Sequence, residues 1–379
     1  MATTLQYLIP AEAPSLLGEQ LAQAGLGLRP AQFAQRVGPD FDQLGLMDRG
    51  RRLAAVLARC LPTDFPEAAA LLTASMGRPL GLDAKGEPVV SGDVPSSFFY
   101  LPHSFYIAEH GLHHLDEALR AQHALTQRFT AELSLRPFLL RHTQHTLDAL
   151  AVWAVDPSAH VRRAASEATR PRLPWAARLP AFIRDPSPVL PLLTRLRDDS
   201  SSYVRRSVAN HLNDIGKDHP DRLNALAAEW LGEAPVPDSR QALLRHALRT
   251  AIKRGDTQAL ALFGHGQRSA LVVQTTGLHP AAVRIGERVT LRCALHNPTR
   301  QTATALVDWR VHYVKANGSE SPKVFKGRTV SVEPGATVLL EKTLSLRQMT
   351  TRVHHPGRHG VEITLNGHSQ PVGHFDLLA

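Results

Sequence analysis

The spacing of apolar residues changes character once along the chain, near residues 265–280. Before this point, leucine and alanine recur every three or four positions among polar residues, which is the pattern of amphipathic helices. After it, apolar and polar residues alternate in short runs such as 289–291, which indicates strands separated by turns. The pattern predicts a helical domain over residues 1–265 and a β-domain over residues 270–379, with a glycine-containing linker at 263–269.

The first part of the helical region is expected to contain several short helices and one long loop. Helical spacing is found in four early segments, namely 15–25, 31–37, 41–60 and 65–76. Residues 77–97 are rich in glycine, proline and serine, which predicts a loop. Phe98, Phe99 and Tyr100 follow it, and a long helical stretch then continues to Leu150. We expect these three aromatic side chains to lie in the core rather than to form a platform for stacked bases.

An internal repeat dominates the second part of the helical region. Residues 156–167 (DPSAHVRRAASE) align with residues 199–210 (DSSSYVRRSVAN) at a constant offset of 43 residues, and residues 243–253 (LLRHALRTAIK) are a degenerate third copy. Periods of about 40–47 residues are typical of HEAT and armadillo arrays, in which each unit is an antiparallel helix pair. The opening aspartate and serines are expected to cap a helix, with Val161 and Val204 in the core and the paired arginines outside.

The C-terminal region is predicted to be an immunoglobulin-like β-sandwich of about seven short strands. Turn sequences that contain Asn-Gly or Pro-Gly separate its alternating runs. Trp309 falls in a mid-domain strand, which is typical of such folds, and Cys293 has no second cysteine here with which to form an inter-sheet disulfide. The predicted fold class is therefore multidomain α plus β, a HEAT-like α-helical repeat solenoid followed by an immunoglobulin-like β-sandwich.

Composition and charge restrict the classes of protein and partner. The 379 residues include 43 Lys and Arg against 34 Asp and Glu, a formal charge of +9 that favours polyanionic partners such as nucleic acid. Cys60 and Cys293 fall in different predicted domains, which argues against a disulfide framework and a thiolate metal site. We expect no signal peptide and no membrane span, because no apolar stretch approaches the roughly 20 residues that cross a bilayer. A cytoplasmic protein is expected.

Arginines gather in the repeat region. Residues 156–206 contain ten arginines against five acidic residues. The pairs Arg162–Arg163 and Arg205–Arg206 occupy equivalent positions in consecutive copies and are expected to share one face, a geometry that can follow a phosphate backbone. The alternative is a solvated face with ion pairs along each helix.

Two sequence blocks in this region resemble the AlkC branch of the AlkC/AlkD DNA glycosylases. They are residues 160–175 (HVRRAASEATRPRLPW) and residues 203–220 (YVRRSVANHLNDIGKDHP), and residues 244–250 (LRHALRT) fit the same pattern. The similarity covers most of residues 1–265. It implies a bacterial, nucleoid-associated DNA glycosylase that hydrolyses the N-glycosidic bond of cationic alkylated bases such as 3-methyladenine in base excision repair.

The resemblance also implies roles for individual residues. Catalytic carboxylates map to Glu132, Glu167 and Asp214, and the tryptophan that contacts the lesion maps to Trp175. Ala168 departs from the pattern, in which a glycine is expected. DNA binding is assigned to the arginines of the repeat region and to one asparagine, a set made up of Arg162, Arg163, Arg170, Arg172, Arg205, Arg206 and Asn210.

The residue types support this chemistry independently of the resemblance. Glu167 and Asn210 are equivalent positions of the repeat, and Asp214 follows Asn210 by about one helical turn. Alkylation at N3 or N7 leaves the base cationic and a good leaving group, so carboxylates need only stabilise an oxocarbenium-like sugar and direct water. We expect Glu167 to be the central carboxylate, Asp214 to orient water and Glu132 to support them. The alternative is that Glu167 merely pairs with arginines of its helix and that Asp214 pairs or caps locally.

Double-stranded DNA containing alkylated bases is the expected partner of a monomeric protein, and no metal or other cofactor is expected. Histidines crowd residues 110–114 and 142–145, but no carboxylate or cysteine completes a zinc set. The resemblance implies that the base is read without being flipped into a deep pocket. Trp175 is expected in the DNA groove, with core packing as its alternative.

Basic residues of the C-terminal region are expected either to clasp DNA or to be ordinary surface charges. They are Lys315, Lys323, Lys326, Arg328, Arg347, Arg352 and Arg358. A non-catalytic HEAT-repeat DNA-binding protein or scaffold remains the alternative function. A nuclease is disfavoured, because the sequence has no paired-carboxylate metal motif.

Overall fold

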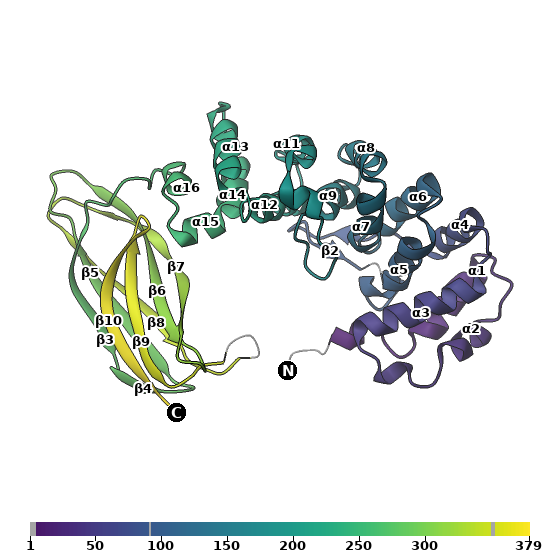
Figure 1. The fold of residues 1–379 in the computed structure, drawn as a ribbon, viewed down its shortest axis with the longest axis horizontal. Coiled ribbons are helices and arrows are strands. Elements are labelled where there is room, and N and C mark those ends of the chain that lie inside the picture. The colour runs from purple at the N-terminus through teal and green to yellow at the C-terminus, as the bar shows by residue number, and fades with distance from the viewer. Residues whose placement is uncertain (1–4, 91, 350–352) are drawn as a thin grey trace. The chain divides into compact units, whose positions relative to one another are not determined.

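The computed structural model describes residues 5–90, 92–349 and 353–379, which places Arg352 outside the described residues. Helices fill most of the chain up to residue 261, and strands follow from residue 272 (Figure 1). The α-helices are α1 (Ala13–Gln23), α2 (Pro30–Val37), α3 (Leu46–Cys60), α4 (Phe65–Ser75), α5 (Leu101–His110), α6 (Leu115–Thr126), α7 (Glu132–Arg141), α8 (Thr143–Trp153), α9 (Ala159–Ala168), α10 (Pro180–Arg184), α11 (Leu190–Leu196), α12 (Ser202–Ile215), α13 (Pro220–Gly232), α14 (Asp238–Ala247), α15 (Arg249–Arg254) and α16 (Thr257–Ala261). Short 3-10 helices occur at Leu5–Leu8, Phe41–Gln43, Ser97–Tyr100 and Ser187–Val189.

The chain forms two compact units. Unit 1 consists of Met1–His219 and Val236–Ala247, and unit 2 consists of Pro220–Pro235 and Leu248–Ala379. This division differs from the predicted boundary near residue 265, because α13, α15 and α16 belong with the strands.

Local contacts inside unit 2 explain this grouping. The Asn224 amide of α13 donates to Asp256 at 3.3 Å and to Gln258 at 3.1 Å, which ties α13 to the start of α16. Gly255 lies against the backbone of Gly367, so closely that a Cβ on Gly255 would meet the Gly367 carbonyl oxygen at 3.0 Å. Polar contacts of this kind between residues distant in sequence leave no hydrophobic pattern that would predict them.

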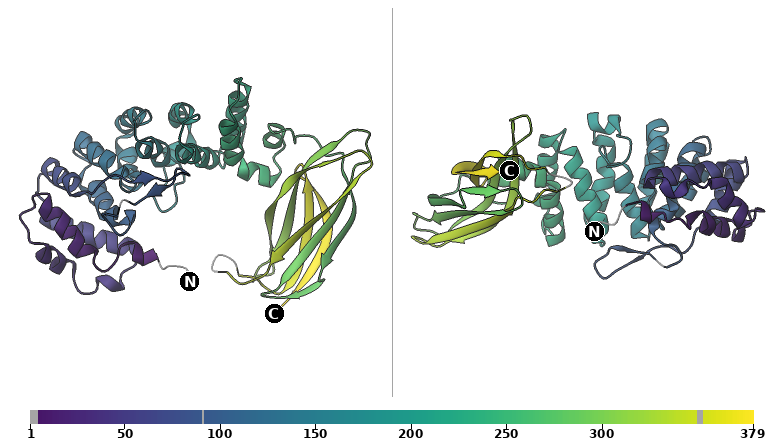
Figure 2. Two further views of the ribbon diagram at one scale, coloured as in Figure 1. Left: turned by 180° about the vertical axis from the view of Figure 1, so that it is seen from behind. Right: turned by 90° about the horizontal axis from the view of Figure 1, so that it is seen from below.

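Unit 1 is a stack of helices in two layers. Helices α3, α5, α7, α9, α12 and α14 each pack against the next, and α4, α6, α8 and α11 form the second layer (Figures 1 and 2). Val161 and Val204, at equivalent positions of the repeat, are fully buried. Their burial and the stacking of helix pairs confirm the predicted HEAT-like solenoid.

The first part of unit 1 has an apolar core and one element that the sequence pattern missed. Phe99 and Tyr100 are buried and belong to this core, whereas Phe98 is only partly buried and packs against it. Within the predicted loop, β1 (Gly81–Leu82) and β2 (Pro88–Val89) pair as a small antiparallel hairpin. Two-residue strands are too short to show the alternation that identifies a strand from sequence.

The repeated aspartate–arginine motif organises the turn before each repeat helix. Asp156 and Asp199 accept the main-chain N–H of the serine two residues later, at 2.7 and 2.8 Å. Those serines occupy the N-cap positions of α9 and α12 but make no side-chain cap hydrogen bond, so the prediction that serine caps these helices is wrong. Arg162 and Arg205 donate back to main-chain carbonyls of the same turn.

Arg162 also joins consecutive copies of the repeat. Its guanidinium makes two hydrogen bonds to Asp199 of the next copy, at 2.6 and 2.9 Å. Only 15% of the Arg162 side chain and 6% of the Asp199 side chain are exposed. The prediction that both arginines of each pair stand outside is therefore wrong for the first pair, because Arg162 bridges two repeats and the Arg163 side chain is only 16% exposed.

Unit 2 contains a sandwich of two sheets (Figure 2). Its strands are β3 (Val272–His279), β4 (Ala282–Arg284), β5 (Arg288–His296), β6 (Ala303–Val314), β7 (Glu320–Val332), β8 (Thr337–Ser345), β9 (Gly357–Leu365) and β10 (His368–Leu378). One sheet has the order β4-β10-β9-β6-β7 and the other β3-β5-β8, and all pairs are antiparallel except β10 with β4. Trp309 of β6 and the free Cys293 of β5 are buried between the sheets. These features confirm the predicted immunoglobulin-like sandwich, although β6 and β7 are longer than expected.

A bulge interrupts β6 at the point where buried and less buried residues stop alternating along the strand. The register with β7 shifts between Val307 and Trp309, and the Asp308 carboxylate accepts the Gly327 N–H at 2.8 Å. A Cβ on Gly327 would lie 1.9 Å from the Val307 carbonyl oxygen, so only glycine fits this close approach of two strands. The bulge is consistent with three consecutive buried residues at 307–309.

Replacing Asp199 with alanine should destabilise unit 1 by about 3 kcal/mol, because a buried arginine then loses its partner. Chemical denaturation of the full chain measures the loss. Asp48→Ala is the matched control, since Asp48 pairs with Arg51 on the surface, where both side chains are more than 60% exposed, and should change stability little. Equal losses for the two variants would contradict the bridging role of Asp199.

Candidate active site

Three acidic side chains lie on three successive helices of one layer of unit 1, namely α7, α9 and α12. Glu132 is the first residue of α7, Glu167 lies in the last turn of α9, and Asp214 lies in the last turn of α12. Their side chains are 14%, 8% and 3% exposed, respectively. Carboxylates this poorly hydrated carry a large desolvation cost unless cations lie against them.

Two arginines supply these cations. Arg163 of α9 contacts Glu132 at 2.9 Å and Glu167 at 3.7 Å. Arg170, two residues after α9, contacts Glu167 at 2.6 Å and Asp214 at 2.7 Å. Negative and positive groups thus alternate from α7 to α12, an arrangement that we call the carboxylate–arginine chain. The structure brings the three assigned carboxylates together and also forms the arginine pairs that were the alternative role of Glu167.

Polar residues that the sequence did not single out complete this site. The Ser207 hydroxyl donates to Glu167 at 2.6 Å, and His211 contacts the Ser166 carbonyl through Nδ1 at 3.0 Å. Lys217 donates to the second oxygen of Asp214 at 2.8 Å. Ser207 and His211 stand at positions where the first copy of the repeat has alanine. A polar residue replacing alanine on the buried face of a repeat is the signal that could have found them.

The surroundings push the pKa values of two neighbouring carboxyls apart. Burial raises the pKa of Glu132, and repulsion from Glu167 adds to it, against the attraction of Arg163. Burial also acts to raise the pKa of Glu167, but Arg163, Arg170 and the Ser207 hydroxyl together outweigh it and lower that pKa below the usual glutamate value. Glu167 is therefore held ionised, whereas Glu132 takes up a proton more easily. Burial lowers the pKa of His211 to about 3, so this imidazole is neutral at physiological pH.

Trp175 is displayed on the loop that follows α9. Its side chain is 65% exposed, and its φ of 64° lies in the left-handed region that bulky residues rarely adopt. The alternative that Trp175 packs in the core is therefore wrong. Packing therefore does not explain why a large ring is kept exposed in an unfavourable backbone conformation.

The residues assigned to DNA binding occupy different environments. Arg162, Arg163 and Arg170 serve mainly within the fold, in the contacts described above. Arg172 makes a two-point contact with Asp218, at 2.7 and 2.8 Å. The amide oxygen Oδ1 of Asn210 in α12 accepts a hydrogen bond from Nε2 of His246 in α14 at 3.0 Å.

Arg206 is the more exposed arginine of the second pair. Its side chain is 45% exposed and makes a two-point contact with Glu87 of the β1–β2 hairpin. The guanidinium groups of Arg163 and Arg206 both lie over the Tyr203 ring, 5.5 and 5.9 Å from its centre. Tyr203 therefore links the carboxylate–arginine chain to the exposed Arg206, a role that the sequence pattern did not reveal.

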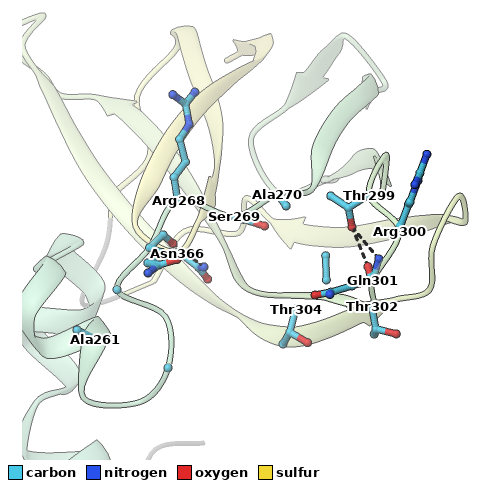
Figure 3. Close-up of a pocket in the computed structure, with 14 residues that line it drawn as sticks. Ala261, Arg268, Ser269, Ala270, Thr299, Arg300, Gln301, Thr302, Thr304 and Asn366 are labelled. Atoms are coloured by element: carbon cyan, nitrogen blue, oxygen red, sulfur yellow. Dashed lines mark hydrogen bonds between the residues drawn. The ribbon is translucent and has the colours of Figure 1, made fainter.

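A separate hollow of about 860 Å³ lies in unit 2, at the linker after α16. Figure 3 shows the Thr299–Gln301 turn and Asn366 on its walls, with Arg268 and Arg300 at opposite sides and not turned toward each other. None of the described residues that line this hollow is acidic, so it lacks the carboxylates of the carboxylate–arginine chain.

Two further properties concern the described residues only. No three His, Cys, Asp or Glu side chains among them converge in a way that would hold a metal ion. None of the helices in the described ranges is both long and apolar enough to cross a membrane.

Comparison with protein families places this combination of fold and site in a defined class. Residues 129–254, which carry all three carboxylates, match the family described as DNA alkylation repair enzyme. Residues 272–379 match the C-terminal immunoglobulin-like domain of the protein YhaZ. The class is therefore that of helical-repeat DNA alkylation repair enzymes with an immunoglobulin-like domain.

Two relatives narrow the class to one branch. YhaZ of Bacillus subtilis, described as uncharacterized, is 36% identical over 328 residues, which is 86% of this chain and 86% of that protein. The structure of Pseudomonas fluorescens alkylpurine DNA glycosylase AlkC, bound to DNA containing an abasic site analogue, is 33% identical with a TM-score of 0.89, and the match covers 100% of both chains. The chain belongs to the AlkC family of DNA alkylation repair enzymes.

Replacing Arg170 with glutamine should cost about 3–5 kcal/mol at neutral pH, because two buried carboxylates lose their shared cation. Arg170 helps to lower the pKa of Glu167, so its stabilising effect is present above the ordinary glutamate pKa and is lost as pH falls through the lowered pKa. The difference in the free energy of unfolding between wild type and variant should therefore shrink on acidification. Urea denaturation at several pH values measures it.

Arg172→Gln is the control for this experiment. The Arg172–Asp218 pair is 26% and 22% exposed, so its loss should cost less than that of Arg170. A difference for Arg170→Gln that stays constant from neutral to acidic pH would contradict the assigned electrostatic role.

Proposed function

We propose that the protein is an alkylpurine DNA glycosylase that hydrolyses the N-glycosidic bond of cationic alkylated bases such as 3-methyladenine. The observation that carries this proposal is the carboxylate–arginine chain, which holds Glu167 ionised beside Glu132 and Asp214 on successive helices. Membership of the AlkC family supports the same activity.

The reaction requires two things of the protein, namely a negative charge near the sugar and a correctly placed water molecule. When the bond between C1′ and the base nitrogen breaks, its electron pair neutralises the cationic base, and positive charge develops on the sugar. An ionised carboxylate stabilises that charge, and a directed water molecule attacks C1′. The water loses a proton, the products are the free base and an abasic sugar, and no cofactor is needed for this balance.

We assign the central electrostatic role to Glu167. Each carboxylate oxygen can accept two hydrogen bonds. Glu167 already uses one oxygen for Arg170 and the other for Ser207, both at 2.6 Å, and these contacts fix the group while leaving capacity for water. Asp214 is assigned to orienting water. Glu132, whose pKa is raised by burial, is assigned a supporting role and a capacity to take up the released proton.

Double-stranded DNA is the proposed partner. The structure of AlkC bound to DNA supports it, as does the basic character of the repeat region. Arg206 is our candidate for a direct phosphate contact because 45% of its side chain is exposed. Arg205 and Asn210 of the same helix, and Arg172 of the loop after α9, are assigned further DNA contacts. Lys326, Arg328 and Lys342 line a second hollow of about 350 Å³ in the sandwich, and we assign DNA contact to the described basic residues of this domain as well.

The damaged base is proposed to remain in or near the duplex. Arginines and a serine already fill the space around the carboxylates, and Trp175 is exposed rather than part of an enclosing wall. A complex with the base extruded into a closed pocket would contradict this proposal.

A non-catalytic DNA-binding protein is the alternative function. The arginine pairing of Glu167 and Asp214 favours it, because a purely structural ion network would show the same contacts. Activity measurements on carboxylate variants separate the two functions.

Glu167→Gln should lower the release of 3-methyladenine from methylated duplex DNA by about 10²–10³-fold, since one stabilising charge at the reaction centre is removed while shape is kept. DNA binding should persist and remain sensitive to salt. Glu117→Gln, which alters a surface pair with Arg120, is the matched control and should retain activity. Salt-sensitive binding without base release by the wild type would support the non-catalytic alternative.

Trp175→Ala should reduce kcat/KM for cationic bases by about 2- to 30-fold, which corresponds to a lost cation–π attraction of about 0.5–2 kcal/mol. Because the side chain is exposed, the melting temperature should not change. Trp175→Phe keeps an aromatic face and should lose less activity than the alanine variant. Full activity of Trp175→Ala would contradict the proposed contact between Trp175 and the damaged base.

A further inference from the structure

Arg136 of α7 is a buried arginine that binds the loop carrying Trp175. Its residue is 1% exposed. Nη1 donates to the carbonyls of Ala168 and Arg170 at 2.8 and 2.6 Å, and Nε donates to the carbonyl of Ala177 at 2.7 Å. Nη2 also donates to Ala177. All the direct hydrogen bonds found for Arg136 in the described part of the chain thus end on main-chain carbonyls that bracket Trp175.

Burying a guanidinium costs free energy when the hydrogen-bond acceptors found for it are uncharged carbonyls. Burial, together with repulsion from Arg170, lowers the pKa of Arg136 to about 10, which leaves it charged at neutral pH. Glu132, Asp214 and Glu167 lie near enough to offset part of this cost by longer-range attraction. An apolar side chain of similar length would pack here without that cost, so the arginine is explained by what it holds.

The loop between α9 and α10 needs additional contacts to fix its conformation. Trp175 has a φ of 64° and is 65% exposed, so neither backbone preference nor packing of its ring keeps it in place. The loop closes through a hydrogen bond from the Leu179 N–H to the Pro171 carbonyl at 3.1 Å. Arg136 adds four donated hydrogen bonds from a planar group, and these fix both ends of the segment that presents the ring.

We propose that Arg136 is a positioning residue, which holds the 168–177 loop so that Trp175 is presented against the cationic base. This proposal rests on the proposed function, in which Trp175 contacts the lesion. Arg136 itself touches neither substrate nor the reacting atoms. The Arg170 carbonyl is held as well, but the Arg170 side chain is kept in place by its own contacts with Glu167 and Asp214. We therefore expect the effect of Arg136 on activity to pass through Trp175 and to vanish when Trp175 is absent.

The test is a double-mutant cycle with Arg136→Lys and Trp175→Ala on release of 3-methyladenine. Lysine keeps the charge but cannot reach three carbonyls in one plane. Arg136→Lys should lower kcat/KM by about as much as Trp175→Ala, about 2- to 30-fold. The double variant should be no worse than Trp175→Ala alone. Additive losses, or full activity of Arg136→Lys, would overturn the proposal.

A fluorescence measurement tests the loop without relying on catalysis. Trp153, Trp230 and Trp309 are buried, so acrylamide quenching of the full chain reports mainly on Trp175. DNA containing an abasic-site analogue should shield this fluorescence in the wild type and shield it less in Arg136→Lys. Equal shielding would overturn the proposal. An absence of base release by the wild type would instead contradict the proposed function, and the shielding result would remain interpretable.

Arg49 provides a matched control for general destabilisation. It is 4% exposed and likewise donates to main-chain carbonyls, those of Ile9, Asp42 and Leu44, in the first part of unit 1. Arg49→Lys should lower the melting temperature to a similar extent as Arg136→Lys while leaving kcat/KM and DNA shielding unchanged. If Arg49→Lys also lowered kcat/KM and DNA shielding, the effect of Arg136→Lys would be explained by lost stability alone, and the proposal would be overturned.

Discussion

An ionised carboxylate that is buried away from water must have a positive charge beside it. This requirement determines the arrangement of side chains at the centre of unit 1. Glu132, Glu167 and Asp214 come from three different helices, and Arg163 and Arg170 lie between them. Each arginine serves two carboxylates, so removing one leaves two buried charges without full compensation. The same contacts that hold the helices in register also decide which carboxylate is ionised.

The arginines of the repeat therefore divide into two kinds. Arg162 and Arg163 act inside the fold, the first as a bridge between repeats and the second as part of the carboxylate–arginine chain. Arg206 is exposed and contacts Glu87 and the Tyr203 ring. A basic surface for DNA and a rigid acidic centre can then coexist in one short motif, because consecutive residues of a helix point in different directions.

Much of this was available from the residue pattern. The 43-residue offset predicted the helix pairs, the alternation after residue 270 predicted the sandwich, and the motif around Glu167 identified the family. The pattern did not reveal Ser207 and His211, because a single polar residue on a buried helix face does not disturb the apolar periodicity. It also missed the β1–β2 hairpin, whose strands are too short to alternate, and the grouping of α13 with the sandwich.

The sequence by itself determined the class of fold and the family, because both depend on local periodicity or on contiguous motifs, and it nominated the three carboxylates whose roles are proposed here. Only the tertiary structure decided which arginine pairs with which carboxylate, that Trp175 is exposed, and that Arg136 holds its loop. The contacts of Arg163 with Glu132, of Arg170 with Asp214 and of Arg136 with Ala168 join residues 31, 44 and 32 positions apart in sequence. They arise from the stacking of helix pairs along the repeat. Burial and ion pairing arise only when the helices stack, and the pKa values follow from both.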